Sequence, residues 1–154
     1  MSRAVAAAAV LAATILSGCA TPAGDRSGDD TTSVGGIVGE WQLTKGGDAD
    51  GSWPVNGIPV TLVISDDAVT GRAPCNSYTG GLTVAGSDLS IDAISSTEVA
   101  CADAARTRLE TRYLAALARV TTVQVDGPSG SPTLTLSGPD ETLRFSLVDK
   151  KSAN

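Results

Sequence analysis

The sequence contains no histidine, and this absence excludes more chemistry than any other feature of its composition. Histidine is the commonest general base, the commonest metal ligand and the usual side chain for sensing pH near neutrality. Lysine and arginine number 11 against 17 aspartates and glutamates, which gives a net charge of −6 without a basic stripe. Because binding to phosphates needs clustered lysine and arginine, we expect no nucleic acid partner.

Aromatic residues are scarce and nucleotide-binding motifs are missing. Only 3% of the 154 residues are aromatic, so the core must be built mainly from valine, leucine, isoleucine and alanine. The sequence has no P-loop, no dinucleotide-binding glycine fingerprint and no Gly-x-Ser-x-Gly elbow. We therefore expect a non-enzymatic, monomeric protein with no catalytic residue, cofactor or metal.

No apolar run is long enough to span a membrane. The run from Ala4 to Leu16 has 13 residues, whereas a spanning helix needs about 20. With Arg3 before it, the run has the length of the apolar part of a secretory signal. Leu16-Ser17-Gly18-Cys19 then resembles the lipobox of bacterial lipoproteins, in which the cysteine receives a diacylglycerol. The alternative is an ordinary secretory signal with an incidental cysteine.

These features predict how the chain is divided and where it is located. Residues 1–18 are expected to be a lipoprotein signal peptide, 19–36 a flexible tether rich in Gly, Asp, Ser and Thr, 37–149 one domain, and 150–154 a tail. Lipidation at Cys19, including a palmitate chain, would hold the domain on the extracytoplasmic side of the cell membrane, because two or more acyl chains anchor stably.

Beyond the tether, alternation of polar and apolar residues predicts about eight short strands. They occupy residues 40–45, 59–65, 68–73, 78–86, 88–95, 121–127, 133–138 and 141–148. A Gly/Asp-rich loop follows the first strand, and within it Asp48 to Gly51 is interpreted as a plain turn. The predicted fold is α+β, an antiparallel meander or partly open barrel with one packed amphipathic helix.

The predicted helix covers residues 102–120, with Asp103 as its N-cap. Apolar residues recur on one face at helical spacing, which is typical of a helix packed on a sheet. That face comprises Ala105, Leu109, Tyr113, Ala116, Leu117 and Val120.

Several short motifs together resemble the META/HslJ-like domain family. The stretch 39–43 resembles its opening "G-x-W-x-L", 75–80 its "C-N-x-[FY]-x-G", 97–101 its "T-x-M-A-C", and 103–117 its helix motif. Pro74, Val99 and Ala104 depart from the family pattern beside motif residues. The residues that carry the resemblance are Trp41, Gly71, Cys75, Asn76, Tyr78, Gly80, Thr97, Cys101 and Glu110.

The resemblance implies an extracytoplasmic or stress-associated domain of antiparallel strands with one packed helix. Bacterial members include heat-inducible proteins and lipoproteins, and the family supplies no catalytic residues. The leading hypothesis is therefore a lipid-anchored envelope protein that acts through protein contacts or in stress tolerance. The alternative is a carrier or sensor of an apolar small molecule inside a partly open barrel.

Three interpretations exist for the two cysteines of the domain. A nucleophilic Cys75 has only Arg72 nearby to activate it, and a zinc site needs more ligands than two cysteines provide. A disulfide between Cys75 and Cys101 fits an oxidising compartment best. By the chain-entropy model, closing this loop contributes about 3–4 kcal/mol.

The other motif residues are interpreted as structural. Asn76 and Gly80 suit turns, and Trp41 and Tyr78 suit packing in the core. Glu110 is expected to form an ion pair with a basic neighbour such as Arg106.

Overall fold

The computed structural model describes residues 34–55 and 57–148. Cys19, the predicted signal peptide and the predicted C-terminal tail lie outside the described residues. The described part contains nine strands and two helices. They are, in chain order, α1 (Val34–Ile37), β1 (Gly39–Asp48), β2 (Gly51–Pro54), β3 (Thr61–Ile64), β4 (Ala68–Arg72), β5 (Ser77–Ala85), β6 (Asp88–Ser96), α2 (Ala104–Leu117), β7 (Thr122–Asp126), β8 (Thr133–Ser137) and β9 (Thr142–Leu147).

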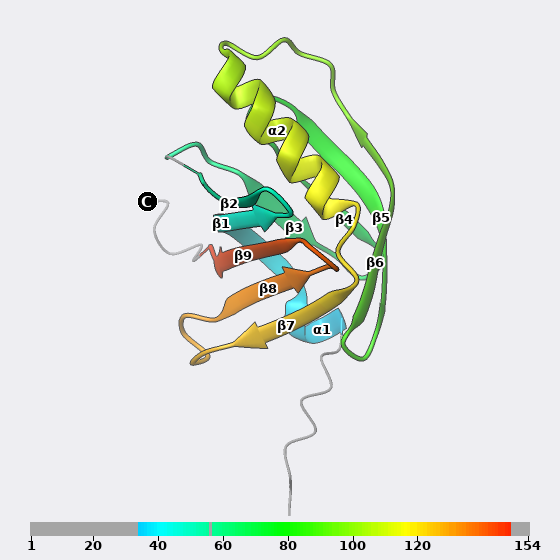
Figure 1. The fold of residues 1–154 in the computed structure, drawn as a ribbon. Coiled ribbons are helices and arrows are strands. Elements are labelled where there is room, and N and C mark those ends of the chain that lie inside the picture. Colours follow the sequence, from blue (N-terminus) through cyan, green and yellow to red (C-terminus); the bar gives the residue numbers. More distant parts are fainter. Residues whose placement is uncertain (1–33, 56, 149–154) are drawn as a thin grey trace, which may run out of the picture.

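Eight of the described strands close into an antiparallel barrel (Figure 1). Their order is β1, β3, β4, β5, β6, β7, β8 and β9, and β9 pairs back onto β1. Trp41 stands opposite Leu147 in that closing pair. The α+β class and all eight predicted strands are confirmed. The ninth strand, β2, was predicted to be part of a loop, because its glycine and proline residues hide the strand pattern.

All five aromatic side chains of the sequence lie in the core: Trp41, Trp53, Tyr78, Tyr113 and Phe145. Two of them occupy space that a neighbouring glycine leaves open. A Cβ at residue 46 would lie 2.1 Å from the Trp53 ring, and one at residue 71 would lie 2.6 Å from the Tyr78 hydroxyl. Leucine, valine, isoleucine and alanine fill the remaining core, as the composition predicts.

Helix α2 joins β6 to β7 and is shorter than predicted (Figure 1). Its predicted N-cap is confirmed, since the Asp103 carboxylate accepts the backbone N–H of Arg106 at 2.8 Å. One member of the predicted apolar face, Ala105, is exposed and not buried. It lies at the surface in an open groove that Trp53 and Ile58 also line. The other members of that face are buried: Leu109, Tyr113, Ala116, Leu117 and Val120. Within the described residues, neither helix is long and apolar enough to cross a membrane.

Arg112 of α2 fastens the β1–β2 hairpin to the helix. Its guanidinium donates to both carboxylate oxygens of Asp48, at 2.7 Å from Nε, and to the Gly51 carbonyl at 3.2 Å. The same group lies 5.7 Å from the centre of the Trp53 ring, within range of a cation–π contact. The Asp48 carboxylate also accepts the N–H of Asp50 at 3.0 Å, which confirms the interpretation of this segment as a turn.

Hydrogen bonds from Arg112 lower the pKa of Asp48 below its usual value of 3.8. A carboxyl group with a lowered pKa stabilises the fold above its usual pKa, and this contribution is lost as the pH falls through the lowered value. We therefore expect Asp48→Asn to reduce the free energy of unfolding by roughly 1 kcal/mol at pH 6. The difference from the parent should shrink as the pH falls below about 4.

Urea denaturation at several pH values, followed by circular dichroism, measures this difference. The matched control is Asp66→Asn, which changes an exposed aspartate in a turn. A cost of Asp48→Asn that stays constant down to pH 2 would show that the ion pair with Arg112 does not stabilise the hairpin.

Candidate functional site

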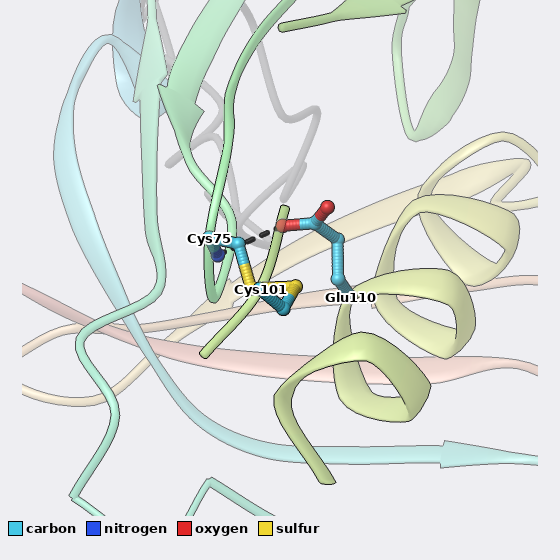
Figure 2. A group of neighbouring side chains, drawn as sticks. All are labelled: Cys75, Cys101 and Glu110. Carbon is cyan, nitrogen blue, oxygen red and sulfur yellow. Dashed lines mark hydrogen bonds between the residues drawn. A yellow bond between two sulfur atoms is a disulfide. The ribbon is translucent and has the colours of Figure 1, made fainter. Parts of the chain in front are cut away.

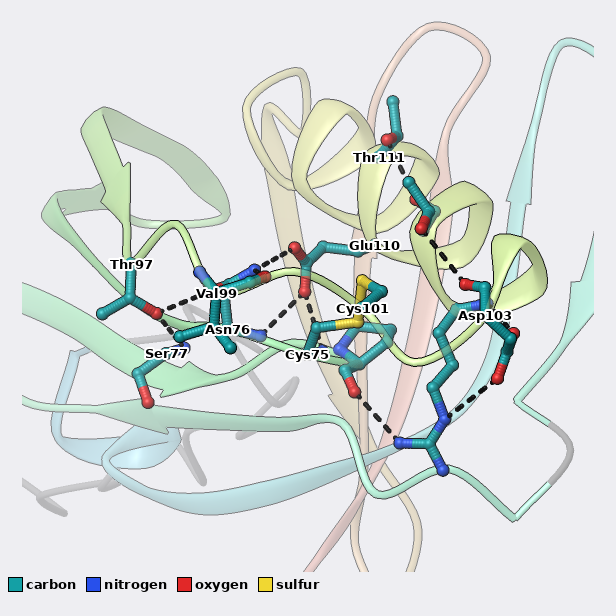
Figure 3. The surroundings of a disulfide bond; sticks show 12 residues. Cys75, Asn76, Ser77, Thr97, Val99, Cys101, Asp103, Glu110 and Thr111 are labelled. Atoms are coloured by element: carbon teal, nitrogen blue, oxygen red, sulfur yellow. Dashed lines mark hydrogen bonds and ion pairs between the residues drawn. A yellow bond between two sulfur atoms is a disulfide. The ribbon is translucent and has the colours of Figure 1, made fainter.

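The motif residues gather where α2 meets the loop between β4 and β5 (Figure 3). Cys75 and Asn76 come from that loop, and Thr97 and Cys101 come from the segment that leads from β6 to α2. Glu110 projects from the helix toward both segments. Three parts of the chain that are distant in sequence therefore meet at one place, called here the Glu110 cluster.

A disulfide joins two of these segments. Cys75 and Cys101 are bonded across a sequence separation of 26, with their Cα atoms 5.4 Å apart (Figure 2). This separation lies within the usual range for disulfides. The predicted pairing is confirmed, and it fixes the segment just before α2 to the loop that precedes β5.

The Glu110 carboxylate joins the helix to the same loop. Its Oε2 atom accepts the backbone N–H groups of Cys75 at 2.8 Å and Asn76 at 2.9 Å, and Oε1 accepts the Asn76 amide at 2.6 Å. The predicted ion pair with Arg106 is wrong. Arg106 faces Asp103 at 3.7 Å and the Pro74 carbonyl at 3.4 Å, whereas Glu110 satisfies two loop N–H groups that need an acceptor.

The side chain of Asn76 uses all of its hydrogen-bonding capacity. Nδ2 donates to Glu110 and to the Val99 carbonyl at 3.1 Å, while Oδ1 accepts the Val99 N–H at 2.7 Å and the Thr97 hydroxyl at 2.8 Å. Asn76 is only 5% exposed, so each bond replaces one that water would otherwise make. Asn76 was predicted to serve the turn itself, whereas its side chain connects the other two segments.

Two tyrosines continue the contact between helix and sheet into the core. The Tyr78 hydroxyl donates to the Thr61 carbonyl at 2.8 Å, so the Tyr113 hydroxyl must be the donor in the 2.6 Å bond between the two tyrosines. Burial raises the pKa of both tyrosines, which keeps them protonated. The contact with Thr61 had no signal in the sequence, because it uses a backbone carbonyl.

The remaining motif residues lie outside the Glu110 cluster. Trp41 is buried, and its indole N–H donates to the Ile37 carbonyl at 2.8 Å, which connects α1 to β1. Gly71 lets β4 pass close to β3 and Tyr78. The prediction that Gly80 serves a turn is wrong, because this residue lies inside strand β5. It stands at an irregularity in the pairing of β5 with β6, where a Cβ would lie 3.1 Å from the Asp92 carbonyl.

The cluster places three candidate metal-binding or nucleophilic groups together. The two cysteine sulfurs and a Glu110 oxygen lie within 4.8 Å of one another (Figure 2). While the disulfide holds, neither sulfur is a thiolate, so neither can act as nucleophile or metal ligand. A shallow depression of about 280 Å³ beside it is lined in part by Arg72 and Arg106. The arrangement itself links three segments of the chain.

Comparison with known families matches residues 36–150 to the META domain. The chain belongs to the META domain family. The resemblance drawn from the motifs is thereby confirmed. No curated protein matches the chain.

Two solved structures share the fold. An NMR structure of a protein from Burkholderia xenovorans has a TM-score of 0.62 and 25% identity, and the match covers 73% of this chain and 83% of that one. A second NMR structure has a TM-score of 0.52 and 20% identity over 75% of this chain and 92% of that one.

Removal of the disulfide should weaken the fold without abolishing it. We expect the double variant Cys75→Ala/Cys101→Ala to lose about 3 kcal/mol of stability, because its unfolded chain is no longer closed into a loop. For a domain of this size that loss lowers Tm by roughly 10 °C. Differential scanning calorimetry measures the shift.

Thiol titration of denatured, unreduced Cys19→Ala protein should find no free thiol, and two thiols per chain would contradict the bond.

Glu110→Gln should destabilise the protein although it preserves shape. All three partners of the Glu110 carboxylate are N–H donors. The NH₂ group of the new glutamine is also a donor, so it would face either the Asn76 side-chain NH₂ or the backbone N–H groups of Cys75 and Asn76. Rotation of the Asn76 amide would relieve the first clash, but it would then oppose like groups at Val99. An unsatisfied buried group costs about 1–3 kcal/mol, measurable by urea denaturation. The exposed Glu98→Gln is the control and should be neutral, and equal stabilities for the two variants would refute this role of Glu110.

Proposed function

We propose that the protein is a non-enzymatic, lipid-anchored envelope protein whose META domain acts through contacts with other proteins. The observation that carries this proposal is the disulfide of the Glu110 cluster, together with the sequence around Cys19. Disulfides persist in oxidising compartments and are rare in the cytosol. The Leu16-Ser17-Gly18-Cys19 motif supplies an anchor that leads to such a compartment.

The Glu110 cluster supports a contact role over catalysis. Its strongest acceptor, the Glu110 carboxylate, is occupied by three donors of the protein itself, and both domain cysteines are bonded. These groups therefore serve the fold. A role in tolerance of envelope stress is the biological setting that the resemblance to heat-inducible members favours.

The packing of the barrel also favours a contact role over the alternative of a carrier. Trp41, Tyr113 and Phe145 are buried among leucines and valines in one core. The groove of about 390 Å³ on the described surface includes the charged side chains of Lys45, Asp48 and Arg144. An apolar ligand inside the barrel would have to displace these core side chains.

The anchor can be tested by replacing the lipidated cysteine. Cys19→Ala removes the thiol that would carry the acyl chains, so we expect the protein to move from the membrane fraction to the soluble envelope fraction. Metabolic labelling with palmitate should mark the parent and not the variant. The control is Ser17→Ala, which keeps a small residue before the cysteine. Equal retention of Cys19→Ala and parent in the membrane would refute the anchor.

A further inference from the structure

One edge of β6 lacks a partner strand over most of its length. β6 pairs with β5 along its other edge, but it meets β7 at a single position, Asp88 opposite Thr122. There the N–H of Leu89 donates to the Thr121 carbonyl at 2.9 Å, and beyond it β7 turns away toward β8 (Figure 1). In the described chain no other strand takes its place. A free edge of this kind can accept an added strand.

A groove of about 450 Å³ lies beside this edge. One wall is the first part of β6, where Leu89 and Ile91 are buried. The opposite wall is the segment that follows α2 and the turn between β8 and β9. The groove therefore places an open depression beside unpaired backbone, where a side chain of an added strand could lie.

The groove is acidic. Asp92, Asp140 and Glu141 line it, and Arg119 is the one basic side chain among its lining residues. Glu141 is only 4% exposed, yet its carboxylate has weak partners. The Arg119 side chain is 70% exposed, and its Nη1 atom lies 3.4 Å from Oε1 of Glu141. The backbone N–H of Asp140 donates to Oε2 of Glu141 at 3.2 Å. Strong charged hydrogen bonds are shorter, at about 2.7–2.9 Å. The nearby C-terminal end of α2 adds partial negative charge.

An irregularity limits how long an added strand can be. Ala93 has a φ of 51°, a left-handed conformation unusual for a residue other than glycine. Between the pairs Thr79–Ser95 and Gly81–Asp92, the strand β6 has one residue more than β5. Such bulges bend a strand and end regular pairing. Regular pairing is therefore available from Leu89 to Asp92 only.

We infer that this edge binds an extended segment of a partner protein, which pairs with Leu89 to Asp92 and places a lysine or arginine on the Glu141 carboxylate. The inference rests on the proposed contact role and gives that role a surface and a partner chemistry. A polypeptide is required because the edge offers backbone hydrogen bonds, and a basic residue is required because the groove holds acidic side chains.

Photo-crosslinking in intact cells tests the inference on the full chain. In one variant a photoreactive amino acid replaces Ser90, which lines the groove. In the control variant it replaces Thr70, an exposed residue of strand β4, and β4 is paired with a strand on both of its edges. We expect a protein adduct from position 90 and none from position 70. Peptide mapping by mass spectrometry should place the crosslink in a partner segment that contains lysine or arginine.

A charge variant then distinguishes specific binding at this groove from non-specific binding. Glu141→Gln should lower the adduct yield at position 90 by at least about tenfold, as expected when a buried charge pair loses one member, while Glu98→Gln leaves it unchanged. Should Glu141→Gln fail to fold, as judged by its melting curve, the exposed Asp92→Lys replaces it with the same expected loss.

The other outcomes overturn the inference in distinguishable ways. Adducts from position 70 but not from position 90 would be consistent with the contact role and would refute the groove beside β6 as its binding site. Adducts at 90 that map to acidic segments, or that are insensitive to both charge variants, would refute the partner chemistry. No protein adduct from either position, or adducts with lipid alone, would count against the contact role as well as the groove.

Discussion

The hydrogen bonds between Glu110, Asn76 and the loop before β5 are the interaction on which the rest of the structure depends. A half-buried carboxylate and a buried amide there satisfy backbone groups from two segments that have no strand partner of their own. The disulfide joins the same two segments covalently. The covalent bond restricts the unfolded chain, whereas the hydrogen bonds specify how the helix lies on the folded barrel.

The position of α2 has consequences near its middle and at its C-terminal end. Near its middle, Tyr113 reaches Tyr78 and Arg112 reaches Asp48, so the helix holds both a barrel strand and the β1–β2 hairpin. At its end the chain must return from the helix to β7, and β7 meets β6 at only one position. The open edge of β6 therefore follows from the way in which the helix is inserted between two strands of the barrel.

This arrangement separates the Glu110 cluster and the groove beside β6 in space. The Glu110 cluster is occupied by internal hydrogen bonds and a disulfide, and it stabilises the fold. The groove beside β6 retains unpaired backbone and a weakly neutralised carboxylate, Glu141. In a barrel with a filled interior, the proposed contact with another protein at this surface would leave the core undisturbed.

Eight of the nine described strands, the helix with its Asp103 cap, the cysteine pair and the family could be predicted from the sequence, because each leaves a local pattern of alternation, spacing or composition. The tertiary structure alone decided the acceptor role of Glu110, the connecting role of Asn76, the burial of Trp53 against Gly46 and the unpaired edge of β6. These features depend on groups that are distant in sequence, and several are backbone atoms, which every residue carries. Local sequence therefore holds no signal for them, and the strand β2 was missed for the same reason: its pairing with β1 and its contact with Arg112 outweigh its loop-like composition.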